Sequence, residues 1–412
     1  MPVRAALAML LLGTVHTHAA IVVPGATGAD GPLTVPVNTN LEINLATSGS
    51  YDATQWAVVF RYTSVTINTG ATVTFKNHPS GAPVIWLVGT GGAGSGDVTI
   101  NGTVNLDGAN GANPPARAEP GPGGFAGGMG LFSNIAPTSG FGPGGGAVNS
   151  SGSYGTKASA VTAREAYGNA SLLPLIGGSG GGGHPIVGFG GGAGGGSILI
   201  AATGNISING QITSKGGNSI NAAGYNSAAG SGGGIRLVAD GIGGTGSVIA
   251  PGGTGGDTSG VGRIRFERVT MNVNMNVSNQ VAPQPSVLEL ASGTSAVIFP
   301  PSGSPTAKVL TVGGQAVPNF PAGSFGNVPA DVKLAQSALG AGNTTVVVIE
   351  TDNVSDTSDV FLLAQPRAAF TGTMQYTAAR DAAYVDPTKD RWNVTVPVAV
   401  GYAALQVRVV RR

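Results

Sequence analysis

Short segments in which apolar and polar residues alternate recur along this chain, and two of them are copies of one another. "VTINGTVNLDGAN" (98–110) and "ISINGQITSKGGN" (206–218) align residue for residue at an offset of 108. A compact apolar run precedes each copy, "VIWLV" at 84–88 and "SILIA" at 197–201. Alternation with a period of two predicts half-buried strands, and repetition of strand–turn–strand units predicts a stacked β array.

An Asn-Gly pair joins the two halves of each copy. Such a pair often forms a two-residue hairpin, which at Asn101-Gly102 would set Thr99 opposite Val104. Residues that face each other across a hairpin share one side of the sheet, so this pairing would mix polar with apolar side chains. We therefore expect the pair to form a corner with positive φ, after which each strand stacks in parallel on the next repeat.

The predicted fold class is all-β. Residues 21–282 are expected to form a glycine-rich right-handed parallel β-helix, a solenoid with a long loop insertion near 113–196. Pro283 and Pro285 indicate the domain boundary. In 286–412 glycine becomes rarer, and eight short alternating segments predict a C-terminal Ig-like β-sandwich.

Glycine is concentrated in one part of the chain, since 55 of the 71 glycines lie between Gly81 and Gly262. A collagen helix would need a strict Gly-X-Y period, which is absent, and disorder does not fit the apolar strands between the glycine runs. We interpret the run at 177–196 as loops and tight corners that feed the array. A bundle of polyglycine II helices is the alternative.

The first 20 residues have the pattern of a removable signal peptide. Arg4 precedes a short apolar stretch, and small residues follow at Ala19 and Ala20. We therefore expect a secreted, extracellular or cell-surface protein. The rest of the sequence contains no long apolar helix, so no membrane span is expected once the signal is removed.

Charge and cysteine content restrict the partners. Removal of the signal peptide takes away Arg4 and leaves 19 basic and 19 acidic residues, hence no formal net charge. This balance argues against nucleic acid or an anionic membrane as a general partner. The chain has no cysteine, so it forms no disulfide and no thiolate metal site. We expect no cofactor and no metal.

Charged and aromatic residues of the insertion are the candidate binding residues, because binding often resides in loops held on a rigid scaffold. They are Arg117, Glu119, Tyr154, Lys157, Arg164, Glu165, Tyr167 and His184. Two Arg/Glu pairs among them, Arg117 with Glu119 and Arg164 with Glu165, have the simpler interpretation of solvated surface charges. His184 lies between Gly183 and Pro185 without a second histidine nearby, which favours a turn residue over a metal ligand.

Acidic residues are too sparse to indicate a catalytic pair. Cleavage of a glycosidic bond uses two carboxyl groups about 5–10 Å apart, and no closely spaced acidic pair occurs in the predicted β-helix. From residue 97 onward its acids are Asp97, Asp107, Glu119, Glu165, Asp240, Asp257 and Glu267. Because the acids are sparse, we predict no catalytic residues. Convergence of Glu119, Glu165 and Asp240 in one groove would instead favour an enzyme.

Several motifs resemble a group of glycine-rich exported bacterial proteins of unassigned function. They are "APVIWLV", "GDVTINGTVNLDG", "AEPGPGGF", "FGPGGG", "GGGSILIAA" and "GGGIRLVA", followed by "TVGGQAVPNFPAGSF" and "NTTVVVIETDNV". The resemblance extends over about residues 55–410 as ordered short motifs. It implies a pectate-lyase-like parallel β-helix followed by an Ig-like β-sandwich, and it implies no activity.

Together these patterns predict a non-enzymatic structural or adhesive protein of the cell exterior. Extracellular polysaccharide and further copies of the chain are the expected partners, since a solenoid offers a long regular surface and open strand edges at its ends. The alternative is a polysaccharide-active β-helix enzyme, a lyase or glycosidase, with the insertion forming its cleft.

Overall fold

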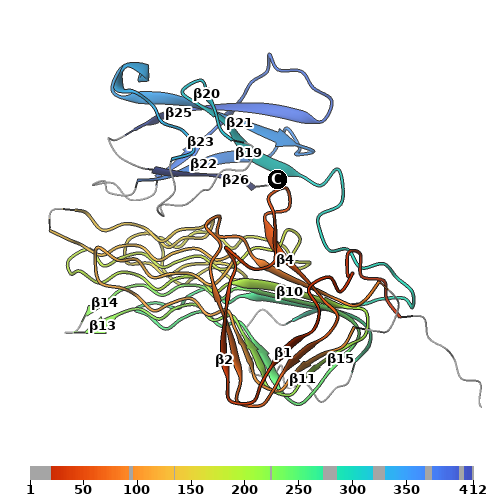
Figure 1. The fold of residues 1–412 in the computed structure, drawn as a ribbon. Helices are drawn as coiled ribbons and strands as arrows, with labels where there is room; N and C mark the ends of the chain where they lie inside the picture. Colours follow the sequence, from red (N-terminus) through yellow and green to blue (C-terminus); the bar gives the residue numbers. More distant parts are fainter. Residues whose placement is uncertain are drawn as a thin grey trace, which may run out of the picture.

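The computed structural model describes residues 20–91, 96–133, 135–222, 225–271, 285–318, 330–366, 374–398 and 403–410. The predicted signal peptide, apart from Ala20, and Pro283 lie outside these residues. The described chain is built of strands (Figure 1), with one short 3-10 helix at Gln336–Ala338. The predicted all-β class is confirmed.

Two sheets form most of the N-terminal part. The larger, of 11 strands, contains β1 (Leu33–Val35), β3 (Ser50–Asp52), β4 (Ala57–Tyr62), β5 (Val65–Ile67), β7 (Val84–Val88), β8 (Val98–Ile100), β10 (Ser197–Ala202), β11 (Asn205–Ile208), β15 (Gly234–Gly243), β17 (Arg263–Met271) and β18 (Ser286–Glu289). The smaller, of five strands, contains β2 (Asn40–Asn44), β6 (Thr72–Lys76), β9 (Thr103–Asn105), β12 (Gln211–Thr213) and β16 (Ser247–Ile249). Neighbouring strands are parallel, except that β3 is antiparallel to β4.

The two sequence copies pair in register, as predicted. Val98 pairs with Ile206 in the larger sheet, and Val104 pairs with Ile212 in the smaller one. Because β8 and β9 belong to different sheets, the Asn-Gly pair between them forms no hairpin. The expected positive φ is wrong for both Asn101 and Gly102. Gly102 is required for space, since an added Cβ would lie 2.3 Å from the main-chain oxygen of Ala71.

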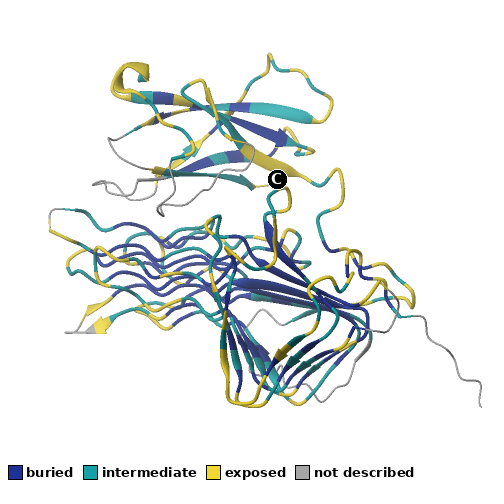
Figure 2. Ribbon diagram, in the orientation of Figure 1, coloured by how far each residue is buried: buried dark blue, intermediate teal, exposed yellow. Residues whose placement is uncertain are grey.

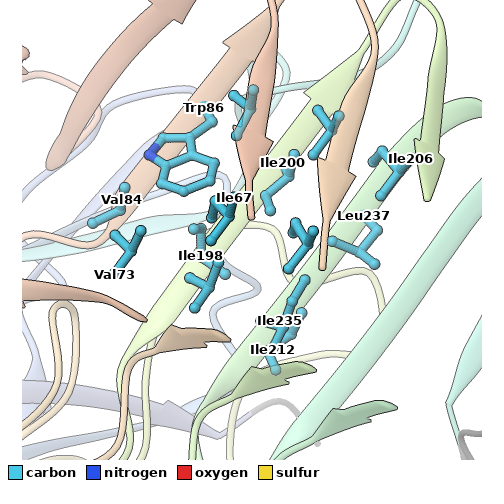
Figure 3. Packing of buried hydrophobic residues seen from close by; sticks show 14 of the residues in the cluster. Ile67, Val73, Val84, Trp86, Ile198, Ile200, Ile206, Ile212, Ile235 and Leu237 are labelled. Carbon is cyan, nitrogen blue, oxygen red and sulfur yellow. The ribbon is translucent and has the colours of Figure 1, made fainter. Parts of the chain in front are cut away.

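The apolar members of each strand form one core between the two sheets (Figure 3). Trp86, Ile200 and Leu237 come from neighbouring strands of the larger sheet, and Ile212 faces them from the smaller sheet. All four are 0% exposed. Burial of whole rows of branched and aromatic side chains supplies the main favourable term for this part of the fold.

Short polar side chains join successive repeats at their edges. The N–H of Asn205 donates to Asp97 Oδ1 at 2.8 Å, and that of Lys215 donates to Asp107 Oδ1 at 2.7 Å. Each donor follows its acceptor by 108 residues. These two carboxylates therefore accept hydrogen bonds that hold the repeats in register.

Glycine-rich segments extend from these sheets toward β13 (Asn221–Ala222) and β14 (Tyr225–Asn226), as Figure 1 shows. We call these segments the glycine bundle (106–157, 177–197, 214–234 and 250–262). Residues 189–197 illustrate its order, because successive N–H groups bond to three different neighbours in rotation. Gly190, Ala193 and Gly196 donate to residues of 106–112, Gly191, Gly194 and Ser197 donate to residues of 122–128, and Gly192 and Gly195 donate to Ala228 and Ser231.

A period of three, with each of these bonds leaving the segment, matches the polyproline II conformation, which has three residues per turn and no internal hydrogen bonds. Outside the turn at 184–189, the interpretation of 177–196 as loops and corners is therefore wrong, and the polyglycine II alternative accounts for the pattern. Glycine is needed for closeness: a Cβ at Gly194 would lie 1.9 Å from the oxygen of Gly178. Figure 2 shows the result, a bundle whose interior is buried although it has few side chains.

Three chain segments cover the outer face of the larger sheet, and one of them contributes Tyr154, Leu172 and Leu175. Ile21 and Val23 precede the first strand, and Ala296 and Ile298 follow the last one; all four are buried in a second apolar cluster. β18 pairs in parallel with β17. The sequence predicts that 286–292 opens the C-terminal sandwich; the structure corrects this, because its strand β18 extends the larger sheet instead.

Two antiparallel sheets form the C-terminal part. One contains β19 (Thr306–Val312), β20 (Gln315–Ala316), β21 (Thr344–Asp352), β24 (Ala379–Arg380) and β25 (Lys389–Pro397); the other contains β22 (Asp359–Pro366), β23 (Met374–Thr377) and β26 (Ala403–Val410). Val347, Leu362 and Trp392 pack in their shared core. One of the eight short segments predicted as strands, "ADVKLAQ" (330–336), forms no strand, and the 3-10 helix at Gln336–Ala338 begins at its end.

Close approach in the glycine bundle can be tested with a single methyl group. We expect Gly194→Ala to lower the free energy of unfolding by at least about 2 kcal/mol, because the new Cβ forces two main chains apart. Gly256→Ala is the matched control, since its Cβ would find no atom closer than 3.4 Å. Chemical denaturation of both variants measures the difference. Equal midpoints for the two would show that the bundle tolerates side chains.

Candidate functional site

Two of the predicted binding residues are tyrosines that hold the main chain, Tyr154 buried and Tyr167 partly buried. Tyr154 is 0% exposed, and its hydroxyl donates to the oxygen of Ile176 at 2.7 Å. The hydroxyl of Tyr167 donates to the oxygen of Gly177 at 2.5 Å. Burial raises the pKa of both phenols. These groups therefore anchor the segment that begins the run at 177.

Arg164 and Glu165 lie against the C-terminal sheets. Arg164 Nε donates to the oxygen of Gly145 at 3.1 Å, and its Nη1 donates to Gln375 Oε1 at 3.3 Å. Lys157 Nζ lies 2.5 Å from Glu165 Oε1, and this hydrogen bond, with the nearby positive charge of Arg408, lowers the pKa of Glu165. These charges join parts of the same chain.

Arg117 and Glu119 are separated by their surroundings. Arg117 Nη1 donates to Thr138 Oγ1 at 3.0 Å, and its guanidinium lies 4.9 Å from the centre of the Phe141 ring. Glu119 is exposed. The predicted pair is thus a packed arginine beside a solvated carboxylate.

His184 lies at a turn at the far end of the glycine bundle. Its Nδ1 accepts the N–H groups of Ile186 and Val187 at 3.1 and 3.2 Å. Its ring is 6% exposed and meets the Tyr225 ring edge to face, with centroids 5.3 Å apart. The favoured interpretation of His184 as a turn residue agrees with this geometry, and the ring also supports an exposed aromatic side chain.

Four turns meet around His184, and we call them the distal loops (113–116, 131–136, 184–189 and 220–226, without the undescribed residues). The N–H of Leu131 donates to the oxygen of His184 at 3.2 Å. A Cβ at Gly188 would lie 3.3 Å from the oxygen of Leu131 and 3.5 Å from Pro114 Cδ. The turns therefore form one surface at the end of the bundle that carries β13 and β14 (Figure 1).

The distal loops expose large apolar side chains. Ile186, Tyr225 and Phe132 are 64%, 40% and 38% exposed. Asn113, Asn221 and Asn226 are exposed on the same loops. None of the four turns contains Lys, Arg, Asp or Glu. This surface thus offers apolar contact and amide groups that both donate and accept hydrogen bonds, without charge.

Sequence reasoning identified His184 in this site and missed Phe132, Ile186 and Tyr225. Their position in the sequence could have identified them. Each is a large apolar residue in a short segment between two glycine-rich runs. Such segments mark the turns of a bundle whose interior is glycine.

Several of the acidic residues identified from the sequence have partners within the chain. No group of three or more His, Asp or Glu residues there is arranged to hold a metal ion. Glu165 contacts Lys157, and Asp257 accepts the N–H of Ser151. The acids identified from the sequence have structural partners in these cases.

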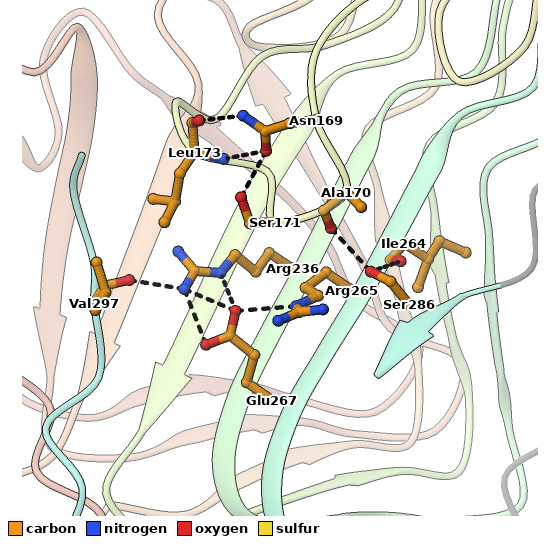
Figure 4. A network of polar contacts seen from close by, with 10 residues as sticks. All are labelled: Asn169, Ala170, Ser171, Leu173, Arg236, Ile264, Arg265, Glu267, Ser286 and Val297. Atoms are coloured by element: carbon orange, nitrogen blue, oxygen red, sulfur yellow. Dashed lines mark hydrogen bonds and ion pairs between the residues drawn. The ribbon is translucent and has the colours of Figure 1, made fainter. Parts of the chain in front are cut away.

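A buried charge cluster lies on the outer face of the larger sheet (Figure 4). Arg236 is 1% exposed, and its Nε and Nη2 each donate to a carboxylate oxygen of Glu267 at 3.0 Å. Nη2 also donates to the oxygen of Val297 at 2.7 Å, and Arg265 Nε reaches the same carboxylate at 3.2 Å. The cluster joins β15, β17 and the covering segment, which is a structural role.

Comparison of the chain with protein-family models, with curated proteins and with solved structures found no match. No helix in the described residues has the length and apolar character needed to cross a bilayer. The chemistry of the site must therefore be argued from its own residues.

The role of the buried cluster can be measured through stability. We expect Arg236→Met to lower the free energy of unfolding by about 3–5 kcal/mol, because it leaves the Glu267 carboxylate buried with a weaker set of partners. The double variant Arg236→Met/Glu267→Leu removes the buried charge as well and should recover most of the loss.

A matched control is the ion pair of Arg268 with Glu289, in which the Arg268 side chain is 13% exposed and the Glu289 side chain 76% exposed. Glu289→Gln should change stability by no more than about 1 kcal/mol. If the single and double variants at Arg236 and Glu267 lose the same stability, packing rather than charge pairing is the contribution of these side chains.

Proposed function

We propose that this protein is a non-enzymatic adhesive component of the cell exterior that binds an uncharged glycan through its distal loops. The observation that carries the proposal is the exposed, charge-free surface formed by Phe132, Ile186, Tyr225 and neighbouring asparagines. Aromatic rings offer large apolar faces with a polar edge, and amides pair with hydroxyl groups in both senses. The signal-peptide pattern of the first 20 residues supports export.

We propose a finer description of the architecture as well. The in-register parallel strands are consistent with a right-handed parallel β-helix over 21–282, and the two antiparallel C-terminal sheets with an Ig-like sandwich within 286–412. In this description the glycine bundle is an extension of the coils that carries the distal loops outward. Loops held on a rigid scaffold are a common place for recognition.

Two other functions follow from the same sequence. A polysaccharide lyase or glycosidase would cleave the glycan that it binds, and a self-assembling protein would bind further copies of the chain through open strand edges. The sparse carboxylates favour binding over cleavage, because glycoside hydrolysis uses a pair of carboxyl groups.

Glycan-array binding by the purified protein tests the proposal, with each bound glycan then incubated and examined for cleavage. We expect binding to uncharged glycans without turnover. Tyr225→Ala should weaken that binding about tenfold, because truncation of a central aromatic contact commonly costs more than 1 kcal/mol.

Tyr51→Ala is the matched control, since Tyr51 is 37% exposed in β3, outside the distal loops. It should leave binding unchanged. Equal weakening by the two substitutions, or binding limited to acidic glycans, would contradict the proposal. Turnover of any glycan would favour the enzyme, and concentration-dependent sedimentation without glycan binding would favour self-assembly.

A further inference from the structure

A shallow groove crosses the stacked strands at the corner between the two parallel sheets. Its volume is about 350 Å³. It is lined by Gly70, Ala71, Thr72, Asn101, Gly102, Thr103, Gly210, Gln211 and Ser247. These residues come from four successive repeats, so the groove runs across the strands and has the repeat of the strand spacing, about 4.8 Å.

The shape of the groove follows from the repeat itself. Gly102 and Gly210 occupy the same corner of successive repeats, and neither has room for a side chain: an added Cβ would lie 2.3 Å or less from a neighbouring main-chain oxygen. The main chains of successive repeats therefore approach closely along this line, and they form the floor of the groove.

One wall of the groove is a ladder of hydrogen-bonding side chains. Thr72, Thr103, Gln211 and Ser247 are consecutive partners in the register of the smaller sheet, and all four are partly exposed. Gln211 Nε2 donates to Thr103 Oγ1 at 3.3 Å. The hydroxyl and amide groups are therefore held at a regular spacing by the sheet and by each other.

Amide side chains next to the ladder continue the pattern, and among them Asn101 lines the groove. Asn209 Nδ2 donates to Asn101 Oδ1 at 2.9 Å, and the N–H of Thr245 donates to Asn209 Oδ1 at 3.4 Å. None of the lining residues is ionisable. A ligand that fits this groove is uncharged, and it presents hydrogen-bonding groups at a short regular repeat.

The main chain of the groove cannot receive an additional peptide strand. The N–H of Thr103 donates to Ala71, that of Gln211 to Gly102, and that of Ser247 to Gly210. Because these groups are used between repeats, a peptide would find no free ladder to join. The floor also offers no apolar pocket for side chains. A chain of sugar rings instead carries the hydroxyl groups that threonine and amide side chains bind.

We propose that this groove is a second binding site, one that takes a single chain of an uncharged polysaccharide running across the repeats. It is separate from the distal loops and does not depend on their function. The sheet fixes the binding groups before the ligand arrives, so little ordering of side chains opposes binding.

Affinity electrophoresis of the full chain through gels that contain hydroxyethylcellulose, mannan or laminarin tests the proposal, with polygalacturonate as the charged comparison. We expect at least one neutral polymer to retard the protein. The double variant Thr103→Ala/Gln211→Ala should bind about tenfold more weakly, because it removes a pair of hydrogen-bonding groups from the ladder.

The matched control is Thr99→Ala/Ser207→Ala. These residues pair in register between the same two repeats, in β8 and β11, and they are also partly exposed, but they lie outside the groove. Retardation should persist in this control and in Tyr225→Ala. Circular dichroism melting of both double variants checks that the sheets remain folded.

Three results would overturn the second site: no retardation by any neutral polymer, retardation by polygalacturonate alone, or equal weakening in the groove variant and its control. The second site would also be overturned if Tyr225→Ala lost retardation while the groove variant kept it. That result would support glycan binding at the distal loops. If Tyr225→Ala bound the glycan array as strongly as the unsubstituted protein, and binding in the groove were intact, only the distal site would be contradicted.

Discussion

Close approach of main chain to main chain is the constraint on which this structure depends. In the glycine bundle, residues 189–197 donate N–H groups to three neighbouring segments in rotation, which requires that no side chain separate them. Oxygens lie about where a Cβ would be, as at Gly191, where the nearest is 2.0 Å away. Buried main-chain groups must be paired, and here that pairing takes the place of an apolar core. A glycine content that would suit a disordered segment therefore forms an ordered one.

The parallel sheets complement the bundle by a different interaction. There, rows of apolar side chains such as Val98 with Ile206 pack inward, so burial of apolar surface fixes the register. Asp97 and Asp107 then secure that register at the edges with hydrogen bonds between repeats. The buried pair of Arg236 and Glu267 attaches the covering segment near Val297 to the same sheet. Hydrogen bonds and an ion pair between distant segments thus reinforce a register that apolar burial sets.

The parts of the fold that could be predicted are specified by side-chain patterns, and the parts that could not are held by main-chain hydrogen bonds. In 98–110 and 206–218 apolar and polar side chains alternate, and this pattern is visible in the sequence. The pairing of the two copies could therefore be predicted, together with the absence of a hairpin. The bundle is held by main-chain groups, and a run of glycines has no side-chain period from which its three-fold pattern could be inferred. Tyr154 and Tyr167 were sensible candidates by residue type, yet only the structure shows that carbonyl groups occupy their hydroxyls. Tyr225 was missed because a single aromatic between short polar segments gives no pattern.

The position of the distal loops follows from the sheets. Residues 189–197 lead directly into β10, and 226–234 lead directly into β15, which pairs with β10 in parallel. A shift in register between these strands would therefore displace His184 and Phe189 relative to Tyr225, although all of them lie at the far end of the bundle. His184 packs against the Tyr225 ring. The strand register that burial of apolar side chains sets in the core therefore also determines the geometry of the exposed surface. Recognition at the distal loops, as we propose it, thus depends on burial in the sheets, through a bundle that is held mainly by main-chain hydrogen bonds.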